Sequence, residues 1–163
     1  MNAVRPKQGQ ESVWDYPRPP RLERCQNTTI KIVSCEKTIV DSDSAWRMLE
    51  TSHPPVYYLP VSAVTNATLR ENRHQSWCEW KGRASYFDLV IDGEVIENAG
   101  WFYPEPAEKY VDLRRTVAFY PSKMDACYVG DERVVCQEGD FYGGWITSQI
   151  VGPFKGGPGT RGW

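Results

Sequence analysis

The sequence lacks the residue patterns by which most metal sites and several classes of enzyme are recognised. Among its 163 residues are five cysteines, but no two of them have the Cys-x-x-Cys spacing of a zinc knuckle. There are two histidines, and no Walker-type phosphate loop or catalytic-triad signature stands out. We therefore predict no bound metal and no cofactor, and we expect the fold to be more informative than any single motif.

Long apolar runs and an excess of charge of one sign are also missing. The chain has 19 Lys and Arg residues against 21 Asp and Glu residues, so no positive field would attract nucleic acid. No run of about 18 apolar residues occurs, and residues 1–10 are polar, unlike a secretory signal. We expect a cytoplasmic protein with free thiols, a monomer or weak homodimer without nucleic-acid or membrane partners.

Aromatic residues and prolines are plentiful, with seven Trp, nine Tyr and 12 Pro. Three Tyr-Pro pairs occur, at Tyr16-Pro17, Tyr103-Pro104 and Tyr120-Pro121. Proline cannot donate a hydrogen bond to a neighbouring strand, so it marks strand ends, and the adjacent ring is amphipathic. The pattern favours short strands that close over an aromatic-lined interior.

Local signals predict several strands. Alternating β-branched residues indicate a strand at 28–34, with 38–41 as its hairpin partner. Asp92-Gly93 separates two apolar-rich runs, 84–91 and 94–102, and such a dipeptide is a strong hairpin signal. Further short strands are expected at 56–59, 116–120, 126–129 and 132–135, the last two joined across Gly130-Asp131.

Two segments favour helix and one favours a loop. In residues 42–50, Ala45, Met48 and Leu49 have helical spacing behind capping serines and aspartates, which predicts a short helix. Residues 105–115 are expected to hold one helical turn. The polar run 65–76 is interpreted as an exposed loop.

We interpret the chain as one domain with two straps. Residues 1–13 form a loose arm, and residues 14–140 form a single β domain that begins with the proline-rich strap 14–20. Residues 141–163 are rich in glycine but keep aromatic rings, which flexible linkers lack, so this tail is expected to dock on the domain. Many short antiparallel strands with one or two short helices predict a mainly β sandwich, tent or half-open barrel.

Several long strings are similar to one known family: ESVWDYPRPP (11–20), LETSHPPVYY (49–58), CEWKG (78–82), ASY (84–86), FYP (119–121) and FYGGWIT (141–147). Together they resemble the family called domain of unknown function 427. The resemblance covers almost the whole chain after about residue 10. It implies a tent-like fold of the β-tent group and no established activity, although members are sometimes labelled nucleotidyltransferase-like. Arg161 stands where that family's pattern would place a tryptophan.

The resemblance raises the question of metal and nucleotide sites. Folds of the β-tent group often hold zinc through two Cys-x-x-Cys knuckles, which this chain lacks. Scattered Cys78, Cys127 and Cys136 are better interpreted as small buried hydrophobic residues than as zinc ligands. The carboxylates of the Asp41-Ser42-Asp43 segment have the spacing of a magnesium site, but they lack a preceding Gly-Ser turn and suit a helix cap better. The glycine-rich segment 152–160 lacks the order of a phosphate loop, and its prolines remove donors.

The remaining candidates for chemistry are ionisable residues. Glu79, Asp88 and His53 are weak candidates for a catalytic acid or base, although His53 also suits a structural hydrogen bond. Glu79, Lys81 and Arg83 alternate with Trp80, which would place them on one face of a strand, either around a ligand or as a cross-strand ion pair. Arg47 and Glu50 would form a surface pair on the predicted helix. The candidate ligand-binding residues are Arg47, Tyr57, Trp80, Lys81, Tyr86, Trp101 and Tyr120.

Three functions are compatible with these residues. The first is binding of a small polar ligand, sugar or nucleotide-like, in an aromatic-lined cleft. The second is an enzyme of nucleotidyl or carbohydrate chemistry, and the third is a non-catalytic interaction or structural domain. Carboxylates that converge on a histidine or lysine in a closed pocket would favour the enzyme. Rings that are buried without a cavity would favour the third.

Overall fold

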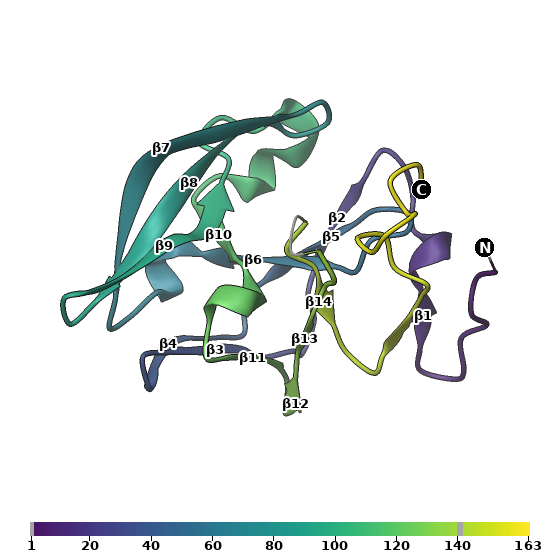
Figure 1. The fold of residues 1–163 in the computed structure, drawn as a ribbon, viewed down its shortest axis with the longest axis horizontal. Helices are drawn as coiled ribbons and strands as arrows, with labels where there is room; N and C mark the ends of the chain where they lie inside the picture. Colours follow the sequence, from purple (N-terminus) through teal and green to yellow (C-terminus); the bar gives the residue numbers. More distant parts are fainter. Residues whose placement is uncertain (1, 140–141) are drawn as a thin grey trace.

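In the computed structural model, which describes residues 2–139 and 142–163, the protein is mainly β with antiparallel main sheets (Figure 1). The larger sheet has seven strands in the spatial order β2 (Arg21–Arg24), β5 (Trp46–Leu49), β6 (Val56–Pro60), β10 (Thr116–Phe119), β9 (Glu94–Phe102), β8 (Gly82–Ile91) and β7 (Thr68–Cys78). The second sheet has four strands in the order β12 (Glu132–Arg133), β11 (Ala126–Val129), β3 (Ile30–Ser34) and β4 (Lys37–Ser42). Neither sheet closes into a barrel within the described residues, and the predicted fold class is confirmed.

Two small sheets and four short helices complete the fold. β1 (Glu11–Ser12) pairs in parallel with β15 (Ile150–Val151), and β13 (Val135–Cys136) pairs with β14 (Trp145–Ile146). All the helices of the described chain are 3-10 turns: η1 (Val13–Asp15), η2 (Val61–Ala63), η3 (Glu108–Leu113) and η4 (Pro121–Lys123). The helical turn predicted within 105–115 is therefore confirmed as η3.

The turn signals were accurate. β8 and β9 form the hairpin predicted around Asp92-Gly93, and these two residues have φ values of 49° and 82°. Positive φ at both central residues is what a tight hairpin with right-handed strand twist requires. The hairpin β3–β4 and the pair β11–β12 across Gly130-Asp131 are also present.

Two of the predicted segments are wrong. Residues 42–50 do not form a helix, because β5 lies between β2 and β6 and makes ladder hydrogen bonds to both. Met48 and Leu49 are consecutive buried residues that pack into different clusters on opposite faces of this strand, and together with Ala45 they imitate helical spacing.

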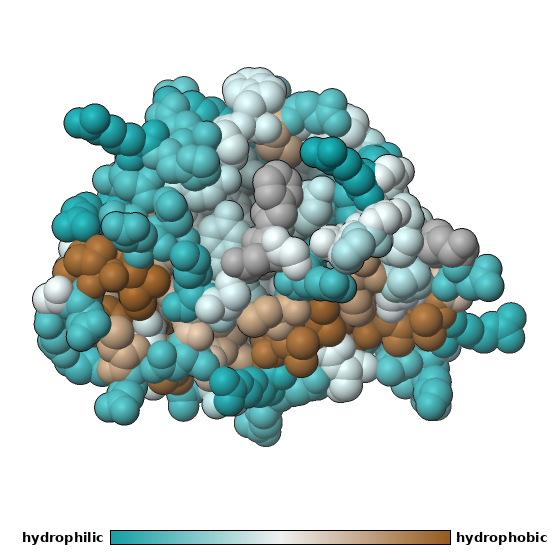
Figure 2. Space-filling view, in the orientation of Figure 1, coloured by the Kyte–Doolittle hydropathy of each residue, from teal (hydrophilic) through white to brown (hydrophobic). Residues whose placement is uncertain are grey.

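The loop expected at 65–76 is instead most of β7, an 11-residue strand at the edge of the large sheet. Its polar composition is explained by this position, since charged residues protect an exposed edge from pairing with other chains. Figure 2 shows hydrophilic side chains over the region of β7 and β8.

The two faces of the seven-stranded sheet have different roles. One face packs against the four-stranded sheet and forms the main core, which includes Ile30, Ile32, Leu59, Phe87, Leu89 and Phe119. The opposite face carries a second cluster, rich in aromatic rings, that includes Met48, Tyr58, Trp101, Tyr103 and Tyr110. Alternation along each strand separates the two sets, so Tyr58 and Leu59 point to opposite faces. The aromatic face is the one that holds the cleft described below.

The C-terminal segment packs on the rest of the molecule. The Trp145 side chain is only 1% exposed, its backbone N–H donates to the Pro55 carbonyl at 2.8 Å, and its indole N–H donates to the Phe119 carbonyl at 3.3 Å. The rings of Trp14 and Trp163 lie 5.5 Å apart, and both chain ends lie on the same side of the molecule (Figure 1). Arg161 is exposed.

Candidate functional site

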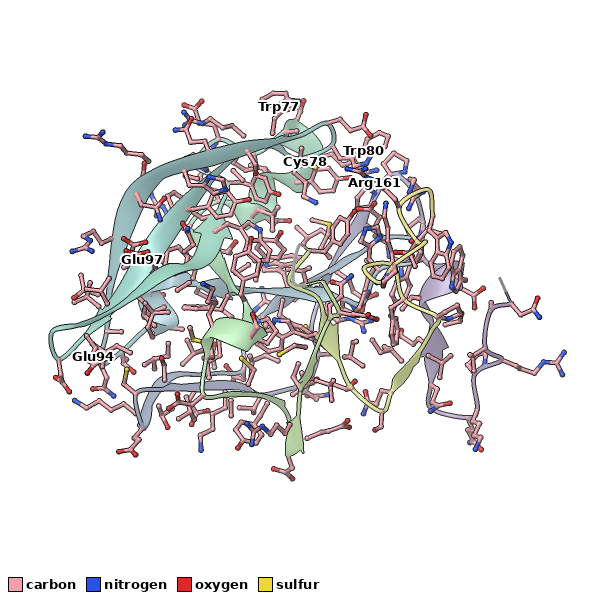
Figure 3. The ribbon with its side chains drawn as sticks, viewed as in Figure 1. Trp77, Cys78, Trp80, Glu94, Glu97 and Arg161 are labelled. Carbon is pink, nitrogen blue, oxygen red and sulfur yellow. The ribbon has the colours of Figure 1, made fainter. Side chains whose placement is uncertain are left out.

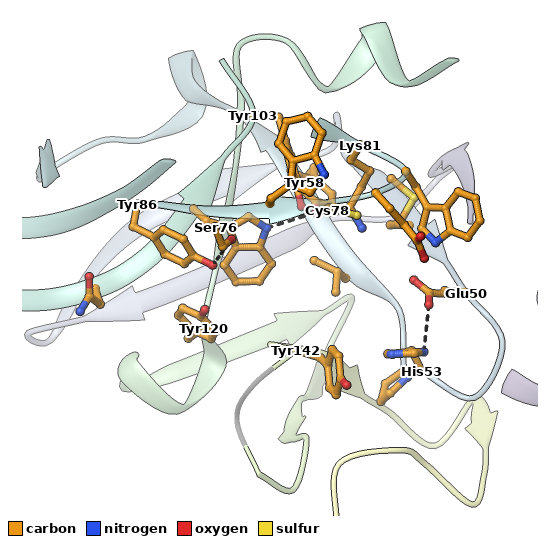
Figure 4. Close-up of a pocket in the computed structure, with 18 of the residues that line it drawn as sticks. Glu50, His53, Tyr58, Ser76, Cys78, Lys81, Tyr86, Tyr103, Tyr120 and Tyr142 are labelled. Carbon is orange, nitrogen blue, oxygen red and sulfur yellow. Dashed lines mark hydrogen bonds and ion pairs between the residues drawn. The ribbon is translucent and has the colours of Figure 1, made fainter. Parts of the chain in front are cut away.

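A cleft of about 900 Å³ opens over the aromatic face of the large sheet. Its floor and one wall come from residues of β5, β6, β7, β8 and β9 and from Tyr103 and Tyr120, which follow β9 and β10, and the β7–β8 turn forms a second wall. The third wall is formed by the turn after β5 and by two side chains of the C-terminal segment, Tyr142 and Lys155. Segments from four distant parts of the sequence therefore meet in one cleft (Figure 4).

The floor is a set of buried rings joined by a hydrogen bond. The Trp101 indole N–H donates to the Tyr58 hydroxyl at 3.2 Å, and the two rings meet edge to face with their centroids 6.4 Å apart. Tyr103 packs on Tyr58 at the same separation of 6.4 Å. The Tyr58 hydroxyl also has the Tyr103 side chain as a hydrogen-bond partner within this floor.

Further rings line the cleft with part of their surface exposed. Tyr120 is half-buried and packs against Trp101 with a centroid separation of 4.7 Å. Tyr86 is also half-buried, and its hydroxyl shares a hydrogen bond of 2.9 Å with the Ser76 hydroxyl. The His74 ring lies 4.2 Å from the Tyr86 ring. These rings offer apolar faces and polar edges to a ligand.

The β7–β8 turn carries the ionisable segment that the sequence singled out. Glu79, Trp80 and Lys81 lie in the turn itself, so the expectation of one extended strand with a shared face is wrong. Gly82 follows with φ of 106°, a conformation that favours glycine. Figure 3 shows Trp77, Cys78 and Trp80 together at this end of the hairpin, where Trp77 is 76% exposed.

Lys81 reaches from this turn into the cleft, and its ammonium nitrogen lies 5.8 Å from the centroid of the Tyr103 ring. Burial lowers the pKa of Lys81, but the neighbouring Tyr58, Cys78 and Glu50 raise it by more, so it lies above its ordinary value. Lys81 is therefore an ammonium ion at neutral pH. It is a half-buried cation beside aromatic rings.

Across the cleft, His53 and Glu50 lie together in the turn after β5. His53 Nδ1 is 2.8 Å from the Thr51 carbonyl oxygen and must donate to it, because a carbonyl only accepts. Nε2 is then the acceptor nitrogen of the neutral ring. A Glu50 carboxylate oxygen lies 3.7 Å from Nδ1.

The His53 ring is held neutral by its surroundings. Burial is the main cause that lowers the pKa of His53, and the Glu50 carboxylate opposes it only in part. The Tyr142 ring packs edge to face on His53 at 4.6 Å, and the Lys155 ammonium lies 5.4 Å from the Tyr142 centroid. Lys155 and Tyr142 therefore complete this wall from the C-terminal segment.

The cleft contains most of the residues that the sequence proposed. Of the ligand-binding candidates, Trp80, Lys81, Tyr86, Trp101 and Tyr120 line it. Of the catalytic candidates, His53 and Glu79 line it.

Three candidates lie elsewhere. Tyr57 points to the other face of the sheet, where its ring packs 5.0 Å from Trp145. The Asp88 carboxylate accepts hydrogen bonds from the Asn98 backbone N–H at 3.0 Å and the Asn72 amide at 2.8 Å, and these lower its pKa. They hold the irregular register between β8 and β9.

Arg47 does not pair with Glu50, since it lies on a strand and not on the predicted helix. Its guanidinium binds the carboxylates of Glu11 at 2.8 Å and Glu23 at 2.7 Å, and it joins β1, β2 and β5. Both of its sides are therefore occupied by protein carboxylates.

Sequence reasoning missed several cleft residues, among them Glu50, Lys123, Tyr142 and Lys155. Met48 and Glu50 are two residues apart, so in an extended chain their side chains point to the same side. This spacing would have indicated Glu50 as a cleft residue if residues 46–49 had been interpreted as a strand. For Tyr142 and Lys155 no local signal exists. They reach the cleft because Gln137 anchors their segment, donating to the Lys155 carbonyl at 2.6 Å and accepting from the Gly144 N–H at 2.9 Å.

Metal ligands and membrane spans were sought in the same described residues. No group of three or more His, Cys, Asp or Glu side chains is arranged to hold a metal ion there. None of the five cysteines, all of which are described, forms a disulfide. Within residues 2–139 and 142–163, no helix has the length and apolar character needed to cross a membrane.

Comparison with known proteins gives one result. A family model described as domain of unknown function (DUF427) matches residues 21–130, about two thirds of the chain. That match contains both walls built by the large sheet and the β7–β8 turn, but it ends before Tyr142 and Lys155. No curated protein matches the chain.

Proposed function

This chain belongs to the family described as domain of unknown function (DUF427), and on that premise we propose that it binds a small polar ligand, sugar or nucleotide-like, in the cleft over its aromatic sheet face. The observation that carries the proposal is the set of half-buried rings in that cleft. Trp80, Tyr86 and Tyr120 leave part of their surface open to a concave space, which rings that only fill a core do not do.

The size and chemistry of the cleft support the same proposal. A volume of about 900 Å³ falls within the range of small-molecule sites. Its walls carry the Lys81 ammonium and the Glu50 carboxylate. Aromatic faces for a ring and a few converging polar groups for its substituents are the usual composition of a ligand pocket.

A thermal-shift screen of nucleotides, nucleosides, sugars and divalent metals tests this proposal, because a ligand that binds the folded state raises the melting temperature by mass action. The variant Trp80→Ala should weaken a hit about 2- to 12-fold, the range for loss of one stacking ring. Trp46→Ala is the matched control, since Trp46 is also half-buried but does not line the cleft. Equal weakening by both variants would contradict binding in this cleft.

An enzyme of nucleotidyl or carbohydrate chemistry is the second candidate. It is favoured by one observation, a neutral histidine and a carboxylate 3.7 Å apart in a cleft that also holds a lysine. In that role His53 Nε2 would accept a proton from a bound hydroxyl.

The test for the enzyme is incubation with nucleoside triphosphates and sugar phosphates, followed by phosphorus NMR. A turnover that His53→Gln removes would support it. Glu94→Gln is the control, because Glu94 lies at the far end of the β8–β9 hairpin (Figure 3). Turnover that survives His53→Gln would show that His53 is not the base.

A cytoplasmic location and a monomeric or weakly dimeric state stay predictions. That none of the five cysteines forms a disulfide supports the first, because reduced cysteines are typical of reducing compartments. Light scattering coupled to size exclusion would determine the second.

A further inference from the structure

The position of Lys81 is set by the backbone of the β7–β8 turn. The Lys81 carbonyl accepts a hydrogen bond from the Ala107 N–H at 3.0 Å, which ties the turn to the segment before η3. Gly82 has φ of 106°, and a Cβ there would touch the Glu105 carbonyl oxygen at 3.4 Å. The turn is therefore fixed on one side by this contact, and the Lys81 side chain extends into the cleft on the other (Figure 4).

The Lys81 ammonium has no counter-ion in contact. Across the described part of the chain, none of the ion pairs within 4.0 Å includes it. The nearest charged influence is Glu50, but that carboxylate lies 3.7 Å from both Arg18 and His53. Cys78 gives this ammonium a side-chain hydrogen bond, but no carboxylate of the described residues lies within ion-pair distance of it, so a bound anion could still pair with it.

Among the described residues that line the cleft, lysines outnumber carboxylates. Lys123 and Lys155 also line it, and within the described residues their ammonium groups donate to backbone carbonyls, those of Glu97 at 3.4 Å and Trp163 at 3.3 Å. Against these three lysines, the described lining contributes two glutamates, Glu50 and Glu79. The charge that the cleft can still accept is therefore negative.

We propose that the ligand is a ring compound that carries an oxyanion, a phosphate or a carboxylate, and that Lys81 binds this oxyanion. This inference rests on the proposed ligand-binding function and narrows its ligand class. The ammonium would donate to the oxyanion, and the ring would lie against Tyr120 and Tyr86. A neutral sugar or nucleoside would fill the aromatic part and leave Lys81 unpaired.

Matched pairs of probes test the inference: adenosine against adenosine monophosphate, and glucose against glucose 6-phosphate and glucuronate, each measured by isothermal titration calorimetry. The anionic member of a pair should bind about 10- to 100-fold more tightly, the range for a charge-assisted hydrogen bond. Comparing glucose 6-phosphate with glucuronate distinguishes phosphate from carboxylate. Inorganic phosphate alone measures the oxyanion site without a ring.

Variants assign the effect to one residue. Lys81→Met should remove the preference for the anionic probe. Lys81→Arg keeps the positive charge and should retain the preference, so a loss in Lys81→Arg would contradict the inference even if the methionine variant does not fold. Lys109→Met is the control, because the Lys109 ammonium also lies over a ring, 5.6 Å from the Tyr110 centroid, but does not line the cleft.

The outcomes separate the inference from the proposed function. Equal binding of neutral and anionic probes would overturn the oxyanion site and leave ligand binding intact. A preference that persists in Lys81→Met would also overturn it. If none of the probes binds at millimolar concentration, the proposed function fails, and the inference fails with it.

Discussion

The hydrogen bond between Trp101 and Tyr58 connects the stability of the protein to the floor of the cleft. Tyr58 is 2% exposed and Trp101 is 6% exposed, so water cannot replace either partner. The variant Tyr58→Phe keeps the ring and its packing but removes the oxygen that accepts the indole N–H at 3.2 Å. The buried N–H is then left without its partner.

An unsatisfied buried donor costs about 1–3 kcal/mol, and a value near 2 kcal/mol corresponds to roughly 4–8 °C in melting temperature for a chain of this size. Urea unfolding followed by tryptophan fluorescence gives the free energy, and differential scanning calorimetry gives the melting temperature. The denaturant slope should not change, since the packing of the native state is retained.

Tyr86→Phe is the control for this prediction. It removes the same atom from a hydroxyl that bonds Ser76 at 2.9 Å, but this bond lies in an exposed part of the cleft, so water can take its place. We expect a loss below about 0.5 kcal/mol there. Equal effects of the two variants would refute the reasoning, because the Tyr58 hydroxyl would then have no special partner.

Three further predictions concern pH, a close backbone approach and the C-terminal segment. Because the pKa of His53 is lowered in the folded state, protonation favours the unfolded chain, so the free energy of unfolding should fall as pH drops below about 6.5. Denaturant unfolding at pH 7.5 and pH 5 should show a smaller loss of unfolding free energy in His53→Gln than in the wild-type protein. The same loss in both proteins would contradict the role of His53. Gly100→Ala places a methyl group against the Ala118 carbonyl oxygen and should cost about 3 kcal/mol or more by urea unfolding, whereas a neutral effect would place the two strands further apart. Trp145→Ala should cost about 3–5 kcal/mol in the same assay, and a loss below 1 kcal/mol would mean that the C-terminal segment is not docked in the core.

The features that could be predicted from the amino-acid sequence are those with local causes. Asp92-Gly93 specified its hairpin because both residues tolerate the positive φ that the turn requires. Alternation in 28–34 specified β3, an inner strand of the four-stranded sheet, because a period of two places one set of side chains in the core. The aromatic composition, which first suggested a container, corresponds to the ring-lined face of the large sheet.

Elements and groups that depend on distant partners could not be predicted, because their determinants lie in other segments of the folded chain. Residues 46–49 are a strand and not a helix because β2 and β6 bond them on both sides. Lys81, His53 and Lys155 share a cleft because the sheet, the turn after β5 and the C-terminal segment pack together. The spacing of these three residues in the sequence does not predict that they meet. Local propensities are small free energies, and pairing and burial between distant segments exceed them.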